Sequence, residues 1–302
     1  MSKMARRPSG VNRAMPTDSL SPRVEAMMEE KARHIIDPAA AIWKDIQCIR
    51  ATAPLVHNIT NYVVMNTTAN ALLALGASPV MAHAEEEVEE MAGIARSLVL
   101  NIGTLSGAWI DAMVKAGRVA RAKGRPIVLD PVGAGATRFR TECAHRLLRE
   151  VAPAIVRGNA SEIRALVSGG GGTKGVDSTH SSEEALDAAQ SLAKEQRCVV
   201  SVSGSTDLIV SDGAVIRVSN GHPLMPRVTG LGCTATALTG AFAAVNPDPL
   251  AAAAHAMAVM GIAGEIAAEH ARGPGGFQVA FLDALFLLGE SDIRTRLKME
   301  QA

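Results

Sequence analysis

Short apolar runs alternate with helix-like stretches through most of the chain. Five compact runs rich in Val, Leu or Ile have the character of buried strands: residues 54–60, 97–103, 126–132, 154–159 and 198–204. Stretches with apolar residues at helical spacing lie between them, for example residues 61–77 and 106–124. Continuous apolar strands that alternate with helices indicate a mostly parallel sheet with helices on both faces. We therefore expect an α/β fold.

Polar and glycine residues recur where these strands end, as at Asn101, Asp130, Arg157 and Ser203. Ligands of parallel sheets bind at the carboxyl ends of the strands. This edge of the sheet is therefore the predicted site. Farther along the chain, the dipeptide at 212–213 (Asp-Gly) separates two alternating runs and predicts a β-hairpin.

We expect residues 1–40 to be a disordered or loosely ordered leader and residues 41–302 to form a single domain. The first 23 residues are rich in Pro, Ser and Arg and lack the apolar segment of a secretory signal. Residues 168–182 are rich in Gly and Ser. Both a mobile loop beside a site and a plain linker fit that composition.

Charge and composition argue against several classes of partner. Lys plus Arg number 30 and Asp plus Glu number 30, and aromatic residues make up 3%. The chain is therefore not expected to have the positively charged surface or the aromatic side chains for base stacking that nucleic-acid binding needs. No uninterrupted apolar run reaches the roughly 20 residues of a membrane span. The four cysteines show no metal-ligand spacing. A cytoplasmic location, in a reducing compartment, is the expectation.

A glycine-rich segment precedes a strongly helical stretch at residues 228–238, VTGLGCTATAL. Glycines let the backbone approach an anion, and the free amides of a first helical turn point toward it. The same segment is also compatible with an ordinary helix N-terminus whose glycines only allow close packing. The segment matches neither the Walker pattern nor GxGxxG.

Five blocks of the chain resemble hydroxyethylthiazole kinases, in the order of that family. They are PLVHNITNYVVMNTTANALLALGASPVMAHAEEEVEEM (54–91), LVLNIGTLS (98–106), IVLDPVGAGATRFRTE (127–142), VRGNASEI (156–163) and NGHPLMPRVTGLGCTATALTGAF (220–242). The resemblance implies a ribokinase-like fold and a homotrimer with active sites between subunits. It also implies phosphorylation of 4-methyl-5-(2-hydroxyethyl)thiazole by ATP and Mg²⁺, for thiamin biosynthesis or salvage.

The resemblance also implies roles for individual residues. Met81 and Gly230 are the expected substrate contacts, and Arg157 and Ser203 are the expected ATP-binding residues. Asp130 and Glu162 are the acidic residues expected to organise Mg²⁺ through water.

The backbone amides of Gly230, Leu231, Gly232 and Cys233 are expected to form an anion hole for the migrating phosphoryl group. Cys233 stands where other ribokinase-fold kinases carry an aspartate base, and we expect it to be catalytic. At a helix N-terminus the thiolate is favoured, which predicts a lowered thiol pKa.

Each of these side chains also has a structural interpretation. Met81 and Cys233 fit core packing, Arg157 fits an ion pair, and Asp130 and Glu162 fit capping roles; the ordered match of whole blocks favours the functional ones.

Two positions depart from the family pattern. Leu231 replaces a small residue or Thr, which would narrow the substrate pocket, and Ser205 replaces a common acid, which would loosen a metal–water contact.

Three alternatives stay open. Another small-alcohol kinase of the same fold, of the hydroxymethylpyrimidine or pyridoxal type, is the nearest. A ribokinase-fold dehydratase would be expected to keep an aspartate after the glycines, where this chain has Cys233. A non-catalytic ligand sensor would need no intact ATP site.

Overall fold

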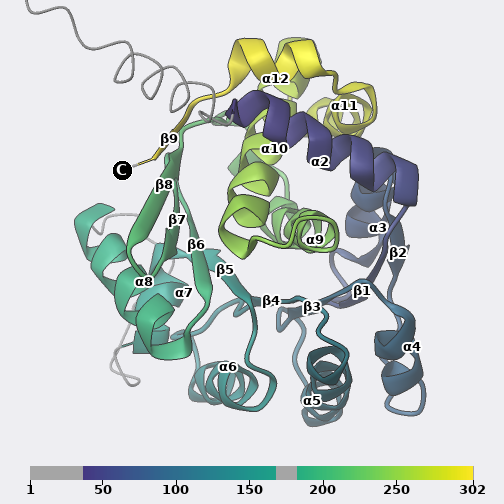
Figure 1. Cartoon of the computed structure of the whole chain (residues 1–302), viewed down its shortest axis with the longest axis vertical. Helices are drawn as coiled ribbons and strands as arrows, with labels where there is room; N and C mark the ends of the chain where they lie inside the picture. Colours follow the sequence, from purple (N-terminus) through teal and green to yellow (C-terminus); the bar gives the residue numbers. More distant parts are fainter. Residues whose placement is uncertain (1–36, 168–181, 302) are drawn as a thin grey trace, which may run out of the picture. The chain divides into compact units, whose positions relative to one another are not determined.

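The computed structural model describes residues 37–167 and 182–301. The chain divides into two units, Met1–Asp37 and Pro38–Ala302. The predicted leader, apart from residues 37–40, and most of the glycine-rich segment 168–182 lie outside the described residues. The second unit contains all of the helices and strands named below (Figure 1).

A nine-stranded mixed sheet in the order β2-β1-β3-β4-β5-β6-β7-β8-β9 forms the centre of this unit. The first six strands run parallel: β1 (Leu55–Ile59), β2 (Ser78–Val80), β3 (Ser97–Asn101), β4 (Ile127–Asp130), β5 (Ile155–Asn159) and β6 (Val199–Ser203). Three antiparallel strands complete one edge: β7 (Asp207–Ser211), β8 (Ala214–Val218) and β9 (Met299–Gln301). The expected mostly parallel α/β sheet is confirmed.

Helices cover both faces of the sheet (Figure 1). One layer contains α2 (Pro38–Thr52), α3 (Met65–Leu75), α9 (Leu231–Ala243), α10 (Pro249–His270), α11 (Pro274–Leu287) and α12 (Glu290–Arg296). The other contains α4 (Val88–Ile94), α5 (Gly107–Ala122), α6 (Arg138–Val151), α7 (Ala160–Val167) and α8 (Ser182–Gln196). Each layer buries its own apolar cluster against the sheet, as expected for strands that are apolar on both sides.

Local sequence sets several element boundaries. Gly76 ends α3 with φ +110° and donates its N–H to Leu72 and Leu73 carbonyls, the geometry that glycine adopts most easily. The Ser106 hydroxyl caps α5 by accepting from the Trp109 amide. The predicted hairpin is confirmed between β7 and β8.

The longest helix among the described residues, α10, is a core helix. By length and apolarity it would qualify as a membrane span, but 78% of its apolar window is buried inside the protein. Its Asp248 N-cap and Pro249 start it. Farther along, His255 Nδ1 lies 2.7 Å from Asp45 Oδ2 of α2, and both side chains are almost fully buried. This polar contact fixes α2 against α10 within the same helix layer.

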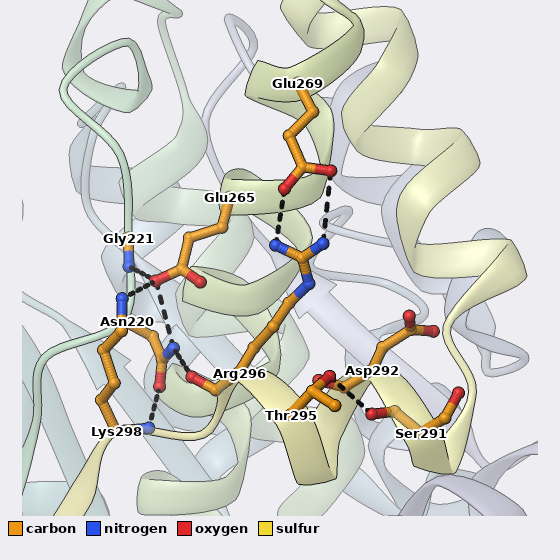
Figure 2. A network of polar contacts seen from close by, with 9 residues as sticks. All are labelled: Asn220, Gly221, Glu265, Glu269, Ser291, Asp292, Thr295, Arg296 and Lys298. Atoms are coloured by element: carbon orange, nitrogen blue, oxygen red, sulfur yellow. Dashed lines mark hydrogen bonds and ion pairs between the residues drawn. The ribbon is translucent and has the colours of Figure 1, made fainter.

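A polar network attaches β9 to α10 (Figure 2). Glu265 Oε1 accepts from Asn220 Nδ2, from the Gly221 amide and from Lys298 Nζ, at 3.1, 3.1 and 2.9 Å. Asn220 also donates to the Arg296 carbonyl at 2.7 Å. The network holds the start of the segment that leads from β8 into α9, and with it the entry to the glycine-rich loop.

Candidate active site

Sheet register brings the polar strand ends together. Asn101, the last residue of β3, pairs in register with Asp130, the last residue of β4. Asn101 Nδ2 donates to Asp130 Oδ2 at 2.7 Å, and Thr236 Oγ1 of α9 donates to the same oxygen at 2.7 Å. Asn61, just after β1, donates to Asn101 Oδ1 at 2.9 Å. One buried chain of hydrogen bonds thus runs from β1 to α9 across the predicted edge.

Asp130 is buried, and this burial raises its pKa to about 7. The negative charge of Glu162 contributes to this rise in pKa, whereas the positive Arg157 and the hydrogen bonds from Thr236 and Asn101 oppose it. The carboxyl group is therefore held in a position where its charge depends on what else occupies the site.

Glu162 spans two loops of the site. Its Oε1 accepts from the Gly133 amide and its Oε2 from the Asn159 amide, each at 2.8 Å. The cause is local: Glu162 lies in the first turn of α7, and the glycine of the β4–α6 loop lies within its reach. Glu162 can accept these two backbone hydrogen bonds and also face a cation, because each carboxylate oxygen keeps a free lone pair.

The glycine-rich loop begins α9 and packs against the segment after β1. Gly230 adopts φ +82°, and a Cβ there would lie 2.5 Å from Val64 Cγ1. Only glycine fits both the left-handed backbone and this contact. The amides of the first helical turn have no carbonyl partner within the helix. Leu231, Gly232 and Cys233 of the predicted anion hole occupy that turn.

Arg157 supports this loop from the neighbouring strand β5. Its Nη1 donates to the Gly232 carbonyl at 2.8 Å, and the side chain is only 7% exposed. Its Nε is buried with no hydrogen-bond partner among the described residues. The hydrogen bond that holds this guanidinium is thus with the backbone of α9, and within residues 37–167 and 182–301 Arg157 forms no ion pair with a neighbouring helix.

Cys233 lies within this polar group, and Asn61 Nδ2 donates to its sulfur at 3.4 Å. The predicted lowering of the thiol pKa is wrong. Burial, followed by the negative charge of Asp130, raises the pKa of Cys233 to about 11. Desolvation disfavours the thiolate more than hydrogen bonds from Asn61 and Asn101 and the charge of Arg157 favour it.

The remaining predicted residues lie at other strand ends of the same sheet. Ser203 ends β6, and its hydroxyl is 3.4 Å from the Gly158 carbonyl. Met81, half-buried, directly follows β2. Ser205, the departure from the family acid, lies in the turn before β7. Two residues on, the buried Asp207 accepts from the Gly204 amide at 3.0 Å, and burial raises its pKa to about 6.

Sequence reasoning missed three members of the site: Asn61, Thr236 and Asp207. Asn61 and Thr236 contact the predicted residues from segments far away in the chain, through β1 and α9. The signal that was available is their position: Asn61 follows a strand end, and Thr236 lies one turn after the glycines on the same helix.

The acidic residues suit Mg²⁺ held through water. Mg²⁺ keeps several of its waters and uses one or two carboxylates together with phosphate oxygens. Asp130 and Glu162 supply two carboxylates with free lone pairs, Asp130 next to Thr236 of α9 and Glu162 next to Gly133 of the β4–α6 loop. Among residues 37–167 and 182–301, no cluster of three or more His, Cys, Asp or Glu side chains is placed to enclose a metal ion. The donor set therefore fits an ion that a nucleotide brings, not a protein-enclosed metal.

Comparison with known proteins places the chain in a family. The model of the hydroxyethylthiazole kinase family matches residues 46–291. The hydroxyethylthiazole kinase of Syntrophus aciditrophicus is 61% identical over 258 residues, covering 85% of this chain and 96% of that protein. The corresponding protein of Leptospira biflexa is 57% identical over 254 residues, covering 84% and 95%.

Solved structures agree. The hydroxyethylthiazole kinase of Pyrococcus horikoshii superposes with a TM-score of 0.81 at 48% identity, over 87% of this chain and 99% of that one. Pyridoxal kinase from Staphylococcus aureus superposes with a TM-score of 0.57 at 15% identity, over 82% and 98%. The second likeness shows a shared fold, and it confirms the ribokinase-like architecture. The chain belongs to the hydroxyethylthiazole kinase family.

Proposed function

We propose that this protein transfers the γ-phosphoryl group of ATP to the primary alcohol of 4-methyl-5-(2-hydroxyethyl)thiazole, giving the thiazole phosphate for thiamin biosynthesis. The observation that carries the proposal is the joint placement of the glycine-rich start of α9, the Arg157 guanidinium and the carboxylates of Asp130 and Glu162 at one sheet edge. It lies within a family match that covers residues 46–291.

Phosphoryl transfer depends mainly on positioning and on neutralising charge. The first-turn amides of α9, from Leu231 to Cys233, have no acceptor within the helix and suit the equatorial oxygens of the migrating group. Gly230, which has no side chain, lets Val64 pack directly against the loop at that point. Arg157 fixes the loop through the Gly232 carbonyl, so the amides need little rearrangement during the reaction.

Asp130 and Glu162 are the residues that would hold Mg²⁺, through its bound water. When bound, the ion would neutralise charge on the triphosphate. Burial of Asp130 raises its pKa to about 7, and a cation beside it would favour the ionised form. The Glu162 carboxylate is already oriented by two backbone amides.

The nucleotide would approach from the side of β5 and β6. Arg157 and Ser203 lie on these neighbouring strands, and Arg157 pairs in register with Ser201, two residues before Ser203. Asp207 adds a carboxyl group beside the Ser203–Gly204 turn. It supplies an acid near the place where Ser205 departs from the family pattern.

Cys233 acts, in this proposal, as a neutral group beside the reacting hydroxyl. A thiol whose pKa is about 11 stays protonated near neutral pH, so it repels the γ-phosphate less than a carboxylate would. Asn61 donates to the sulfur and so fixes its orientation. In a dissociative transition state the attacking hydroxyl keeps its proton until late, and that proton then passes to an oxygen of the newly formed phosphate ester or to water.

The thiazole alcohol would bind at the β1–β2 side, with Met81 and Gly230 as contacts. Val64 packs against Gly230, which places the segment after β1 at the wall of this pocket. Pyridoxal or hydroxymethylpyrimidine kinase activity is the second candidate. The likeness to pyridoxal kinases, at 15–19% identity, supports the architecture only.

A homotrimer with sites between subunits is part of the proposal. Large apolar side chains are exposed on α3 and α11 and after β1, among them Val63 (68%), Leu73 (59%) and Val279 (64%). Exposed apolar side chains that lie near each other mark contact surfaces.

A cytoplasmic location is also part of the proposal, because the reaction consumes ATP and a small-molecule alcohol.

A coupled assay of ADP release tests the function. Purified protein with ATP and Mg²⁺ is given the thiazole, pyrimidine and pyridoxine alcohols in turn. We expect the thiazole alcohol to give the highest kcat/KM and Asp130→Asn to reduce it by at least about 100-fold. ADP release that no alcohol stimulates would contradict the proposal, and a preference for pyridoxine would favour the second candidate.

A further inference from the structure

Three aromatic rings meet beside the proposed substrate pocket. The ring centroids of Tyr62 and Trp109 lie 5.0 Å apart, those of His83 and Trp109 4.9 Å, and those of Tyr62 and His83 6.3 Å. The chain contains one tyrosine and two tryptophans in 302 residues. The cluster thus contains the single tyrosine of the chain and one of its two tryptophans.

The backbone of this cluster is the wall of the site. Tyr62 directly follows Asn61, whose amide donates to the Cys233 sulfur at 3.4 Å. Two residues after Tyr62, Val64 packs against Gly230. The segment that carries the tyrosine thus contacts the glycine-rich loop on both sides of Tyr62.

The other two rings come from neighbouring strand ends. His83 follows β2, and its Nδ1 lies 3.2 Å from the carbonyl oxygen of Met81, the predicted substrate contact. Trp109 lies in the first turn of α5, just beyond β3. The three rings therefore come together where β1, β2 and β3 end.

The rings differ in exposure. Trp109 is 8% exposed, so it is a buried support, whereas Tyr62 is 64% exposed. No hydrogen bond to the Tyr62 hydroxyl occurs among the described residues. Within a single subunit this large aromatic side chain is held by two rings and is open on its remaining surface, so it offers a stacking face to a ligand.

We propose that Tyr62, supported by Trp109 and His83, stacks on the heteroaromatic ring of the substrate and makes the enzyme prefer aromatic over saturated-ring alcohols. The inference rests on the proposed function, which puts the reacting hydroxyl at the glycine-rich loop. A two-carbon arm then places the ring of the alcohol within reach of the wall that carries Tyr62. The flat phenol face suits offset stacking on a flat heteroaromatic ring.

A binding experiment without ATP tests the cluster directly. The protein contains two tryptophans, Trp43 and Trp109, so Trp43→Phe leaves fluorescence from the cluster alone. Titrating this variant with the thiazole alcohol should change Trp109 emission, and adding Tyr62→Ala should raise the dissociation constant by about 2- to 12-fold, the range for one aromatic pair. Tyr62→Phe, which keeps the ring, should keep the larger part of the affinity.

Kinetics supply the specificity readout. The ratio of kcat/KM for the thiazole alcohol to that for 2-cyclopentylethanol, which has a saturated ring of similar size, should fall in Tyr62→Ala through a higher KM for the thiazole. Phe139→Ala, which truncates another exposed ring in α6 that takes no part in the cluster, should leave the ratio unchanged.

The outcomes separate the two proposals. Wild-type protein that phosphorylates the thiazole alcohol, with Tyr62→Ala binding it as tightly as wild type, overturns the stacking inference alone. Binding by the cluster without phosphoryl transfer overturns the proposed function alone. A Tyr62→Ala variant whose oligomeric mass changes in light scattering, with an unchanged specificity ratio, would place Tyr62 in a contact between copies and also overturn the inference.

Discussion

The raised pKa of Cys233 predicts how the rate of phosphorylation depends on pH. With a pKa of about 11, only about one thiol in 10⁴ is ionised at pH 7, because the thiolate fraction falls tenfold for each pH unit below the pKa. A reaction that required the thiolate would therefore speed up about tenfold per pH unit from pH 7 toward pH 10. We expect no such rise.

Three variants separate the thiolate from the neutral thiol. Cys233→Ser keeps an acceptor for the Asn61 amide but does not ionise in this range, so we expect its kcat to stay within about tenfold of wild type. Cys233→Ala removes the acceptor, and its kcat should be lower than that of Ser by about 2- to 10-fold, the equivalent of one modest hydrogen bond. Cys233→Asp introduces an acid beside the buried Asp130, and the like charge should raise the pKa of the new carboxyl group.

The measurement is kcat at saturating ATP, Mg²⁺ and thiazole alcohol from pH 6.5 to 9.5, at constant ionic strength. Melting temperatures of the three variants control for misfolding. The rate of alkylation of Cys233 at pH 7 should also be slow, because the thiolate is the nucleophile. A slope of one in log kcat against pH for wild type, absent in Cys233→Ser, would refute the neutral-thiol reasoning.

Three further predictions concern stability. Gly240→Ala would place a Cβ 2.5 Å from Val99 Cγ2, so we expect urea denaturation to show a loss of about 1–3 kcal/mol. The control Gly93→Ala meets its nearest atom at 3.9 Å and should lose nothing. Burial raises the pKa of Asp207 to about 6. Because the folded form holds this proton more tightly than the unfolded form, the free energy of unfolding falls as pH rises from about 4 to about 6. The melting temperature of wild type should therefore fall over this pH range, and that of Asp207→Asn should fall less. Glu265→Ala removes the acceptor of three donors (Figure 2) and should cost about 2–4 kcal/mol in thermal unfolding; an unchanged melting temperature would contradict the anchoring role of this network.

The amino-acid sequence by itself determined most of the secondary-structure units and the edge of the sheet at which the candidate site lies. Apolar runs and helical spacing predicted the parallel strands and the helices between them, because both signals are local. The hairpin between β7 and β8 followed from the Asp212-Gly213 turn, and Gly213 indeed adopts φ +88°. The ordered family blocks predicted the fold and the family, and the comparisons confirmed both.

Only the tertiary structure decided how the site residues act on one another. Asn61 and Cys233 are 172 positions apart in the chain, and no local pattern pairs them. The ionisation of Cys233 was predicted in the wrong direction, because the helix N-terminus is visible in the sequence whereas burial and the nearby Asp130 are not. A pKa sums desolvation and all surrounding charges, so it is a property of the folded environment and not of the motif. The cluster of Tyr62, His83 and Trp109 has the same origin, since three strand ends must meet before their rings can touch.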